Sequence, residues 1–464
     1  MPPALALLLC FILLLLLLRY DPAKDPTASP ALWVPLIWMF ILGSRSPAQW
    51  LGLIPTSAAT AFEEGSPLDR SVFLLLIVLA LWILAARQLN WPEVFARNSA
   101  LALFLLFALA SVTWSDFPFI SFKRWIRDLG TYVMAFVVLS DPRPLEAIST
   151  LIRRLSYLLL ILSTVLIKYY PEMGVFYDPW TGRPEYAGAA TSKNMLGVIC
   201  LISGLFYFWD TLGRWPRRRA RGPKRILFVN IALIAMTLWL INLSDSATSR
   251  GCLVIGCLII TLVRSKWAKA NPRRVTAAIA VALSAYVLLE FAFDLSSMVA
   301  QLLGRDPTLT GRTGMWNALL EVQTQPLIGV GYQSFWLGSR LTAIWSSLGV
   351  GFLNEAHNGY LEIYLNLGLV GLALLGLFMA SSYRTVCRQL TTSPHFASLS
   401  LALWAVMVFY NVTEVAFGAS LLWCTLLLCV IAVPRVRRRD AFRRGRASRE
   451  EAAAARSTAS SESV

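Results

Sequence analysis

The hydrophobic residues of this chain are gathered into long uninterrupted runs and are not spread as stripes along one face of a helix or strand. Clear examples are residues 4–18, 72–86 and 369–380. A helix that crosses a bilayer needs about 20 mostly apolar residues, with a range of about 17–25. The pattern therefore predicts a series of membrane-spanning helices instead of a soluble globular domain.

Thirteen runs of this kind can be counted, and we expect a helix in each. Their cores are residues 4–18, 31–43, 71–87, 99–113, 126–140, 155–170, 194–209, 226–243, 249–264, 275–293, 359–380, 397–413 and 419–433. The second core is short and contains Pro35, and residues 47–62 have the scattered apolar positions of a segment that lies in the membrane interface. We therefore predict an all-α polytopic membrane protein with 12–13 transmembrane helices.

The composition agrees with this prediction. Hydrophobic residues make up 57% of the 464 residues and charged residues 15%, whereas soluble proteins average about 45–50% and about 25%. Most of the seven cysteines lie in apolar runs, and their spacing resembles neither a disulfide framework nor a zinc site. With two histidines in the whole chain, His357 and His395, a histidine-rich metal site is excluded.

The net charge of +16 would suggest a nucleic-acid partner in a soluble protein, but the position of the charge argues against one. Half of the 42 basic residues lie in three hydrophilic stretches, with seven in 214–225, five in 264–274 and nine in 435–456. Such clusters mark the cytoplasmic side of a membrane protein. We expect no nucleic-acid partner, and we expect residues 434–464 to form a disordered basic cytoplasmic tail attracted to anionic membrane lipids.

Placing the arginine-rich loops inside makes the other connections alternate across the membrane. The outer face then receives residues 171–193, 244–249, 294–358 and 411–418. The third of these is by far the longest, and a loop of that length is usually functional or a small domain. The expected organisation is an N-terminal transmembrane bundle at 1–293, a long outer loop at 294–358, C-terminal transmembrane helices at 359–433 and the tail at 434–464.

One cation lies on the expected outer face where the ninth hydrophobic run begins. Residues 242–251 put the guanidinium of Arg250 at the outer end of a helix, with hydroxyl groups before it and Gly251 after it. A guanidinium presents a fixed fork of donors that suits a phosphate or a diphosphate. The structural alternative is an arginine that anchors a helix end at the membrane surface.

A second cluster lies inside the long outer loop and combines a cation with glycine turns and aromatic rings. Its members are Gly311, Arg312, Trp316, the segment 326–332 with Tyr332, and Phe335-Trp336. Aromatic faces beside polar donors suit sugar rings as well as lipid headgroups. The structural alternative is an interfacial belt of aromatic residues.

The third cluster, residues 354–362, ends the long loop and contains His357 beside Asn358. Imidazole titrates near neutral pH, so it can take a proton from an attacking hydroxyl that comes within hydrogen-bond reach. Glu355 or Glu362 could orient the ring, although neither has the spacing that guarantees contact on a helix. The structural alternative is a histidine that caps or packs at a helix end.

Two further polar residues stand alone on the outer face. Lys193 could contact a phosphate, or it could simply be solvated in its loop. Glu414, in the short outer turn between the last two helices, could pair with one of the outer arginines.

Taken in order, these residues resemble the O-antigen ligase and O-antigen polymerase superfamily, especially its exopolysaccharide polymerisation branch. The matching segments are 111–115 with Pro118, Ser121 and Arg124, then 188–197 with Lys193-Asn194, 249–251, 311–316, 329–331, 356–361 and 411–414. The resemblance covers roughly residues 30–433. Many members carry His-Lys-Asn where this chain has Ser192-Lys193-Asn194, so any role of that histidine is absent here.

The resemblance implies a bacterial inner-membrane glycosyltransferase with a GT-C-like fold and a long periplasmic loop containing short helices. Such an enzyme transfers a glycan from an undecaprenyl-diphosphate carrier to an acceptor hydroxyl on the periplasmic face, without metal and without cofactor. By resemblance, His357 is the catalytic base, and Arg250 and Arg312 hold the diphosphate. The candidates for substrate binding are Lys193, Trp316, Tyr332, Asn358 and Glu414.

Several functions remain open at this point. A polymerase and a ligase differ in the acceptor, another glycan or the lipid A core, and the motifs slightly favour a polymerase. A transporter or flippase for lipid-linked glycans would use the same arginines without needing His357. A non-catalytic subunit of a polysaccharide export complex would use the long loop as a docking surface. Membrane lipids and other polysaccharide assembly proteins are further expected partners.

Overall fold

The computed structural model describes residues 1–20, 29–53, 65–87, 89–177, 182–217, 221–293, 309–322, 325–348 and 353–433. Within these ranges the regular structure is helical except for one two-stranded antiparallel hairpin. The predicted all-α fold is therefore confirmed. The predicted tail at 434–464 and the first part of the long loop, 294–308, lie outside the described residues.

The first half of the chain contains helices that commonly begin with proline in the first turn, where the missing N–H costs nothing. They are α1 (Pro3–Tyr20), the 3-10 helix η1 (Pro30–Leu32), α2 (Trp33–Gly43), α3 (Pro47–Trp50), α5 (Pro67–Ala86), α6 (Trp91–Arg97), α7 (Ser99–Ala110), η2 (Ser111–Trp114), α8 (Pro118–Leu139) and α9 (Pro144–Tyr169).

The second half begins with a small hairpin and continues with long helices. Its elements are α10 (Pro171–Gly174), β1 (Val175–Tyr177), β2 (Pro184–Tyr186), α11 (Lys193–Arg214), η3 (Trp215–Arg217), α12 (Arg221–Leu243), α13 (Ala247–Arg264), α14 (Lys266–Ala270), α15 (Pro272–Phe293), α17 (Leu309–Glu321), α18 (Gly338–Leu348), α19 (Gly359–Thr392), α20 (Pro394–Thr413) and α21 (Leu421–Val430).

Each of the thirteen predicted hydrophobic cores contains a helix, but fewer of these helices are full membrane spans. Among the described residues, seven helices are long and apolar enough to cross a membrane, or eight if the bent pair at 91–97 and 99–114 is one span. The apolar helices α1, α2 and α21 are shorter, and α8 carries four charged residues, Lys123, Arg124, Arg127 and Asp128. By length and composition, the described part of the chain thus holds seven or eight candidate spans, and the count of 12–13 stays a prediction.

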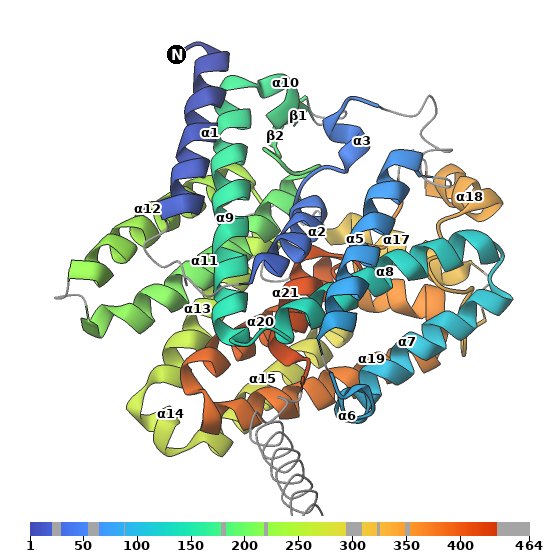
Figure 1. Cartoon of the computed structure of the whole chain (residues 1–464). Coiled ribbons are helices and arrows are strands. Elements are labelled where there is room, and N and C mark those ends of the chain that lie inside the picture. Colours follow the sequence, from blue (N-terminus) through green and yellow to red (C-terminus); the bar gives the residue numbers. More distant parts are fainter. Residues whose placement is uncertain are drawn as a thin grey trace, which may run out of the picture.

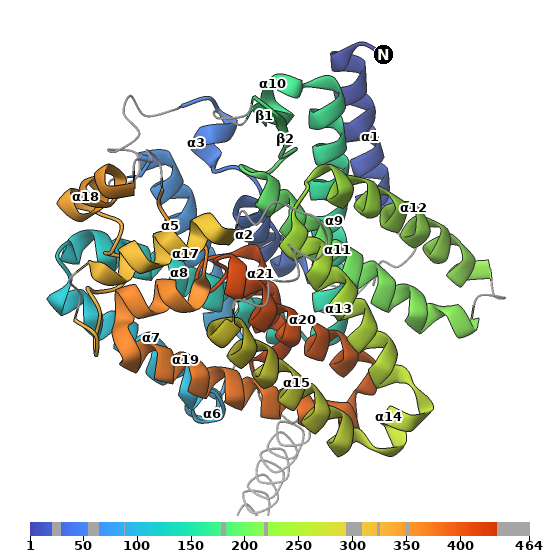
Figure 2. The same ribbon diagram turned by 180° about the vertical axis from the view of Figure 1, so that it is seen from behind.

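The helices form a bundle with a buried centre and a strongly apolar periphery. Figure 1 and, from behind, Figure 2 show α20 and α21 in the middle, and the side chains of α20 and α21 are almost all buried. The outer helices α1, α5 and α12 instead expose large apolar side chains such as Leu8, Leu75 and Phe228. Contiguous apolar surface of this kind matches lipid tails and not water, so the protein is a multi-pass membrane protein.

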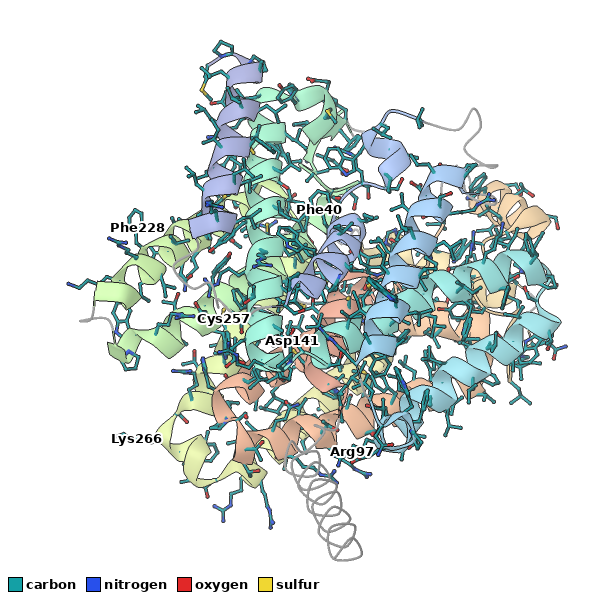
Figure 3. All side chains as sticks on the ribbon, in the orientation of Figure 1. Phe40, Arg97, Asp141, Phe228, Cys257 and Lys266 are labelled. Carbon is teal, nitrogen blue, oxygen red and sulfur yellow. The ribbon has the colours of Figure 1, made fainter. Side chains whose placement is uncertain are left out.

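Two segments predicted to lie on opposite sides of the membrane, residues 171–193 and the basic loop at 264–274, lie toward opposite ends of the bundle. In Figure 1 the hairpin β1–β2, α10 and α3 are at the top, whereas α14 and α6 are at the bottom. Figure 3 places Lys266 of α14 and Arg97 of α6 on that lower side, and Phe228 on the flank. The basic loop at 264–274 is therefore remote from the hairpin.

A backbone break in α19 joins the long loop to the bundle. Gly368 has a φ of 65°, and an added Cβ there would lie 2.3 Å from the backbone of Leu327. Gly329, with a φ of 67°, is equally close to the backbone of Asn366. Backbone N–H groups after the break donate to the loop, with Leu369 N bonded to Pro326 O at 2.9 Å. The groups freed by the break are thus satisfied inside the protein, and the segment that follows the loop is held against α8.

Candidate functional site

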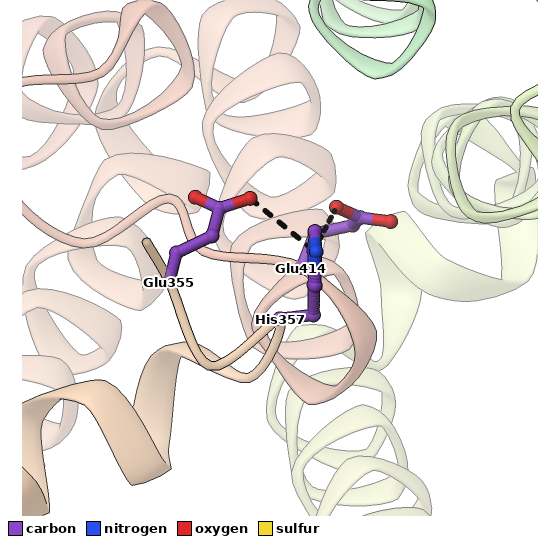
Figure 4. A group of neighbouring side chains, drawn as sticks. All are labelled: Glu355, His357 and Glu414. Carbon is purple, nitrogen blue, oxygen red and sulfur yellow. Dashed lines mark ion pairs between the residues drawn. The ribbon is translucent and has the colours of Figure 1, made fainter. Parts of the chain in front are cut away.

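Three side chains from two separate segments meet where α19 begins and α20 ends (Figure 4). The Nδ1 atom of His357 lies 3.2 Å from Oε1 of Glu355 and 3.6 Å from Oε2 of Glu414. Glu414 is buried, whereas His357 and Glu355 are partly exposed. The imidazole therefore lies between two carboxylates, one from the protein interior and one at the surface.

The backbone at this point is constrained. His357 adopts a φ of 46°, a left-handed conformation that a non-glycine residue seldom adopts and that concentrates at functional sites. The next residue, Asn358, caps α19, because its Oδ1 accepts from the N–H groups of Tyr360 and Leu361 at 3.0 Å each. The predicted substrate-binding residue Asn358 is thus buried and occupied as a helix cap.

A close approach of α19 and α20 brings Glu414 to the histidine. A Cβ added at Gly359 would lie 2.0 Å from Oδ1 of Asn411, and the N–H of Gly359 donates to the carbonyl of Glu414 at 3.0 Å. Asn411 also closes the turn that carries Glu414, since its Oδ1 accepts from the N–H groups of Ala416 and Phe417. The 411–414 motif therefore shapes the site as well as supplying its acid.

The acidic partners of His357 differ in part from those expected. Glu355 contacts the ring as one alternative predicted, but Glu362 points elsewhere, accepting from Trp336 Nε1 at 2.9 Å and from the N–H of Ala356 at 3.1 Å. Glu414 lies beside His357 and also accepts from Nδ2 of Asn194 at 3.1 Å. Asn194, the second residue of the Lys193-Asn194 pair, is thus part of the site.

The same three side chains offer donor atoms of the kind that bind divalent cations. One imidazole nitrogen and two carboxylate oxygens lie within 4.8 Å of one another. Two carboxylates and an imidazole are a common partial ligand set for a metal. The expectation that the protein works without metal stays a prediction.

A cavity of about 790 Å³ is lined by residues of α5, α8 and α19, by the loop at 332–336 and by Glu355. Most of its wall is apolar, and Tyr332 and Trp336 contribute aromatic rings. Four cations also line it, namely Arg70, Lys123, Arg124 and Arg127. An amphiphilic cavity of this size next to a histidine with two acids is a typical ligand site.

One of these four cations, Arg124, belongs to the family signature in the sequence. The other three were not predicted as site residues. Lys123, Arg124 and Arg127 are spaced so that they share a face of α8. The hydrophobic core predicted at 126–140 covers only the second half of that helix. The charged first half was a usable signal, because charges within a membrane helix are costly and usually functional.

Tyr332 is held in this cavity by a buried acid. Its hydroxyl donates to Oδ2 of Asp128 at 2.6 Å, and its N–H donates to Ser111 Oγ at 3.0 Å. Burial, followed by the charge of Asp128, raises the pKa of Tyr332 well above its usual value. The phenol therefore stays neutral and orders the 332–333 turn against α8.

Of the remaining predicted site residues, Trp316 lies beside the segment of His357, whereas Arg250 and Lys193 have other partners. Arg250 opens α13, where it is partly buried and ion-paired with Asp245, and Lys193 Nζ lies 2.5 Å from Glu185 of the hairpin. Trp316 donates to the carbonyl of Ala356 at 2.8 Å, next to His357. Arg312 falls within α17, but its side chain lies outside the described residues.

Comparison with known proteins gives two matches. The O-antigen ligase family model, Wzy_C, matches residues 231–376, from α12 into α19, which include Arg250, Arg312 and His357. The exopolysaccharide production protein ExoQ of Rhizobium meliloti (strain 1021) is 28% identical over 294 residues, which cover 60% of this chain and 63% of that protein. The chain thus matches less than two thirds of the length of this relative.

These matches agree with the ordered motifs and with the apolar helices of the bundle. The matched family model is that of the O-antigen ligases, and the matched relative is named as an exopolysaccharide production protein. Residues 231–376 of the chain thus resemble the O-antigen ligase family, in agreement with the family resemblance of the ordered motifs.

Proposed function

We propose that the protein is an inner-membrane glycosyltransferase whose active site faces the periplasm. It transfers a glycan from an undecaprenyl-diphosphate carrier to an acceptor hydroxyl on a second glycan or on a lipid A core. The observation that carries this proposal is the position of His357 between Glu355 and Glu414, where Glu355 lines an amphiphilic cavity.

The arrangement of the cluster suits His357 as a general base. Both carboxylates lie nearest Nδ1, and a carboxylate only accepts hydrogen bonds, so Nδ1 carries the proton and Nε2 is the basic nitrogen. The carboxylates also stabilise the imidazolium that forms when Nε2 takes a proton. Glu414, being buried, holds the ring in place, while Glu355 connects it to the cavity.

The reaction then balances as a single displacement. The acceptor oxygen bonds to the anomeric carbon of the donor sugar, and its proton passes to Nε2 of His357. The bond from that carbon to the phosphate oxygen breaks, and the carrier diphosphate leaves with the electron pair. Inversion at the sugar carbon follows from this geometry of attack.

The leaving diphosphate gains negative charge, and cations that stabilise it lower the barrier. We assign this role to Arg250 and Arg312 on the strength of the family motifs. Arg250 also lies in the first turn of α13, where the helix dipole favours an anion. Lys193 and Trp316 are proposed to contact the donor from the outer loops.

The test is consumption of the donor by purified protein in liposomes. A lipid-diphosphate oligosaccharide is supplied with both acceptors, and the products are resolved by gel and by mass. The wild type and His357→Ala are compared with His395→Ala, in which the second histidine of the chain is removed. A ladder on one carrier from the wild type and His395→Ala alone establishes a polymerase, and glycan on the lipid A core establishes a ligase.

Two other results would overturn the proposal. If the wild type moves the donor across the bilayer without releasing carrier diphosphate, the protein is a transporter. If the donor is neither consumed nor moved but transfer by another protein of the export machinery depends on this chain, it is a non-catalytic subunit. Equal turnover by His357→Ala and wild type would remove His357 from the mechanism.

A further inference from the structure

The residue before His357 is held through its backbone from two directions. Ala356 is buried, and its N–H donates to Oε2 of Glu362 at 3.1 Å. Its carbonyl accepts from Nε1 of Trp316 at 2.8 Å. Glu362 belongs to the first turn of α19 and Trp316 to α17, so two helices hold the two peptide groups that flank Ala356. The second of these peptide groups contains the N–H of His357.

These hydrogen bonds constrain the left-handed backbone of His357. Its φ of 46° is the rotation between the peptide group that Trp316 holds and the Cα atom of His357. On the other side of that Cα atom, the side chain of Asn358 caps α19. A left-handed conformation is unfavourable for a non-glycine residue and persists only where the surrounding structure over-determines it. The backbone is therefore held on both sides of His357.

Glu362 also joins the segment before His357 to a wall of the cavity. Its two carboxylate oxygens accept from Nε1 of Trp336 at 2.9 and 3.0 Å, and Oε1 accepts from Nδ2 of Asn366 at 3.0 Å. Glu362, Trp336 and Asn366 all line the cavity. One carboxylate thus fixes the segment before His357 relative to the loop at 332–336.

The contacts of Glu362 suit a role within the protein. A carboxylate has about four lone-pair sites and donates no hydrogen bond. The indole of Trp336, the carboxamide of Asn366 and the N–H of Ala356 make four contacts with its oxygens. These contacts use the acceptor capacity of the group, so we do not assign Glu362 to a hydroxyl group of a substrate.

We propose that Glu362 is a positioning residue for the catalytic base, and that Trp316 acts with it. This inference rests on the proposed function, in which Nε2 of His357 takes the proton of the acceptor hydroxyl. Glu355 and Glu414 contact the imidazole itself, whereas Glu362 acts through the backbone before it. A displacement of about 1 Å at a reacting group can cost about 10²-fold in rate. Holding this backbone therefore contributes to catalysis without contact with the substrate.

The inference is tested on the imidazole ring, which does not depend on turnover. Full-length protein is labelled with nitrogen-15 in its histidine rings and reconstituted in liposomes, and solid-state NMR reports which ring nitrogen carries the proton. Because the chain has two histidines, His395 serves as the internal reference. For the wild type we expect His357 to carry the proton on Nδ1, the nitrogen that lies nearest Glu355 and Glu414.

The first variant is Glu362→Gln, which keeps the shape of the side chain but replaces one acceptor oxygen with a donor. One of its donor partners then loses its acceptor, and we expect His357 to become a mixture of both tautomers while the His395 signal is unchanged. The kcat should fall about 10–100-fold with the KM of the donor unchanged. The matched control is Glu146→Gln, which removes an exposed carboxylate from the first turn of α9.

The second variant is Trp316→Phe, which removes the N–H that holds the carbonyl of Ala356 but keeps an aromatic ring for a sugar. We expect the same change of tautomer at His357 and a smaller loss of kcat. The matched control is Trp345→Phe, because Trp345 also donates to a backbone carbonyl, that of Leu353 at 2.7 Å. This control should leave the signals of His357 and the kcat as in the wild type.

Wild-type signals of His357 in both Glu362→Gln and Trp316→Phe would overturn the inference. A raised KM with an unchanged kcat in Glu362→Gln would do the same, because it would make Glu362 a substrate contact. If Glu362→Gln does not fold, Trp316→Phe decides by the same signals. A change of tautomer at His357 in a protein whose wild type transfers no glycan would support the positioning role and count against the proposed function, so the two failures are distinguishable.

Discussion

The two histidines of this chain lie in opposite kinds of environment. His357 has a left-handed backbone, is partly exposed and contacts two carboxylates, one of which, Glu355, lines the cavity. His395, at the start of α20, stacks on Trp209 with ring centroids 4.3 Å apart, and its Nδ1 lies 2.7 Å from Nη1 of Arg264. The first ring lies between two acids, whereas the second lies between an aromatic ring and a cation, in a residue that is exposed.

The charged groups around the two histidines differ in the same way. Next to His395, Asp210 accepts from Arg153 at 2.7 Å, from Arg214 at 2.8 Å and from Asn230 at 2.8 Å, which joins α9, α11 and α12. Arg153, Asp210 and Asn230 are buried, and their hydrogen bonds link three helices. Satisfied buried networks specify packing, while the cluster at His357 combines charge with access to a cavity, as a reactive site requires.

The largest expected effect is the loss of catalysis on removing the base. His357→Ala should lower glycan transfer about 10²–10⁴-fold, the usual contribution of a general base, with the melting temperature nearly unchanged. His395→Ala should show the reverse, a lower melting temperature with turnover per folded molecule retained. Equal effects of the two substitutions on turnover would show that the two histidines do not differ in their roles.

The next effect is on stability, at the opposite end of the bundle. Asp210→Ala should destabilise the protein by about 3–5 kcal/mol, because it leaves the buried guanidinium of Arg153 without its acid. Thermal unfolding in detergent measures this. The exposed pair Arg97 and Glu93, at 2.6 Å, is the control, since Glu93→Ala should change stability by less than about 1 kcal/mol.

A smaller effect separates the two acids beside His357. Glu414→Gln should reduce turnover about 10–100-fold, because the buried acid orients the ring and stabilises its charged form. Glu355→Gln should reduce it less, since that carboxylate is partly exposed and screened by water. Initial rates at saturating donor and acceptor report both, and a larger loss in Glu355→Gln would reverse the proposed roles.

The smallest expected effect is that of metal removal. Although His357, Glu355 and Glu414 could hold a cation, their proposed role as base and orienting acids needs none. We expect incubation with a chelator to leave the transfer rate unchanged, and added Mg²⁺ or Mn²⁺ to leave it unchanged as well. Loss of activity with the chelator, restored by one cation, would replace the base mechanism with a metal-assisted one.

Much of the architecture was predictable because it depends on neighbours in the chain. A run of apolar residues favours a helix wherever it is placed, which is why all thirteen cores are helical. Clusters of Lys and Arg are likewise visible without the fold, as are short motifs such as Ala356-His357-Asn358-Gly359. The apolar runs did not predict the length of each helix, since α2 and α21 are too short to count as membrane spans by themselves.

The sequence by itself therefore determined the helical membrane class, the His357 motif and the family resemblance. The tertiary structure decided which distant groups meet: Glu414 with His357, Tyr332 with Asp128, and the cations of α8 with the cavity that Glu355 also lines. These pairs depend on close backbone approaches, at Gly359 against Asn411 and at Gly329 against α19. Such contacts depend on where two helices cross. The position of a crossing cannot be predicted from a local pattern of residues.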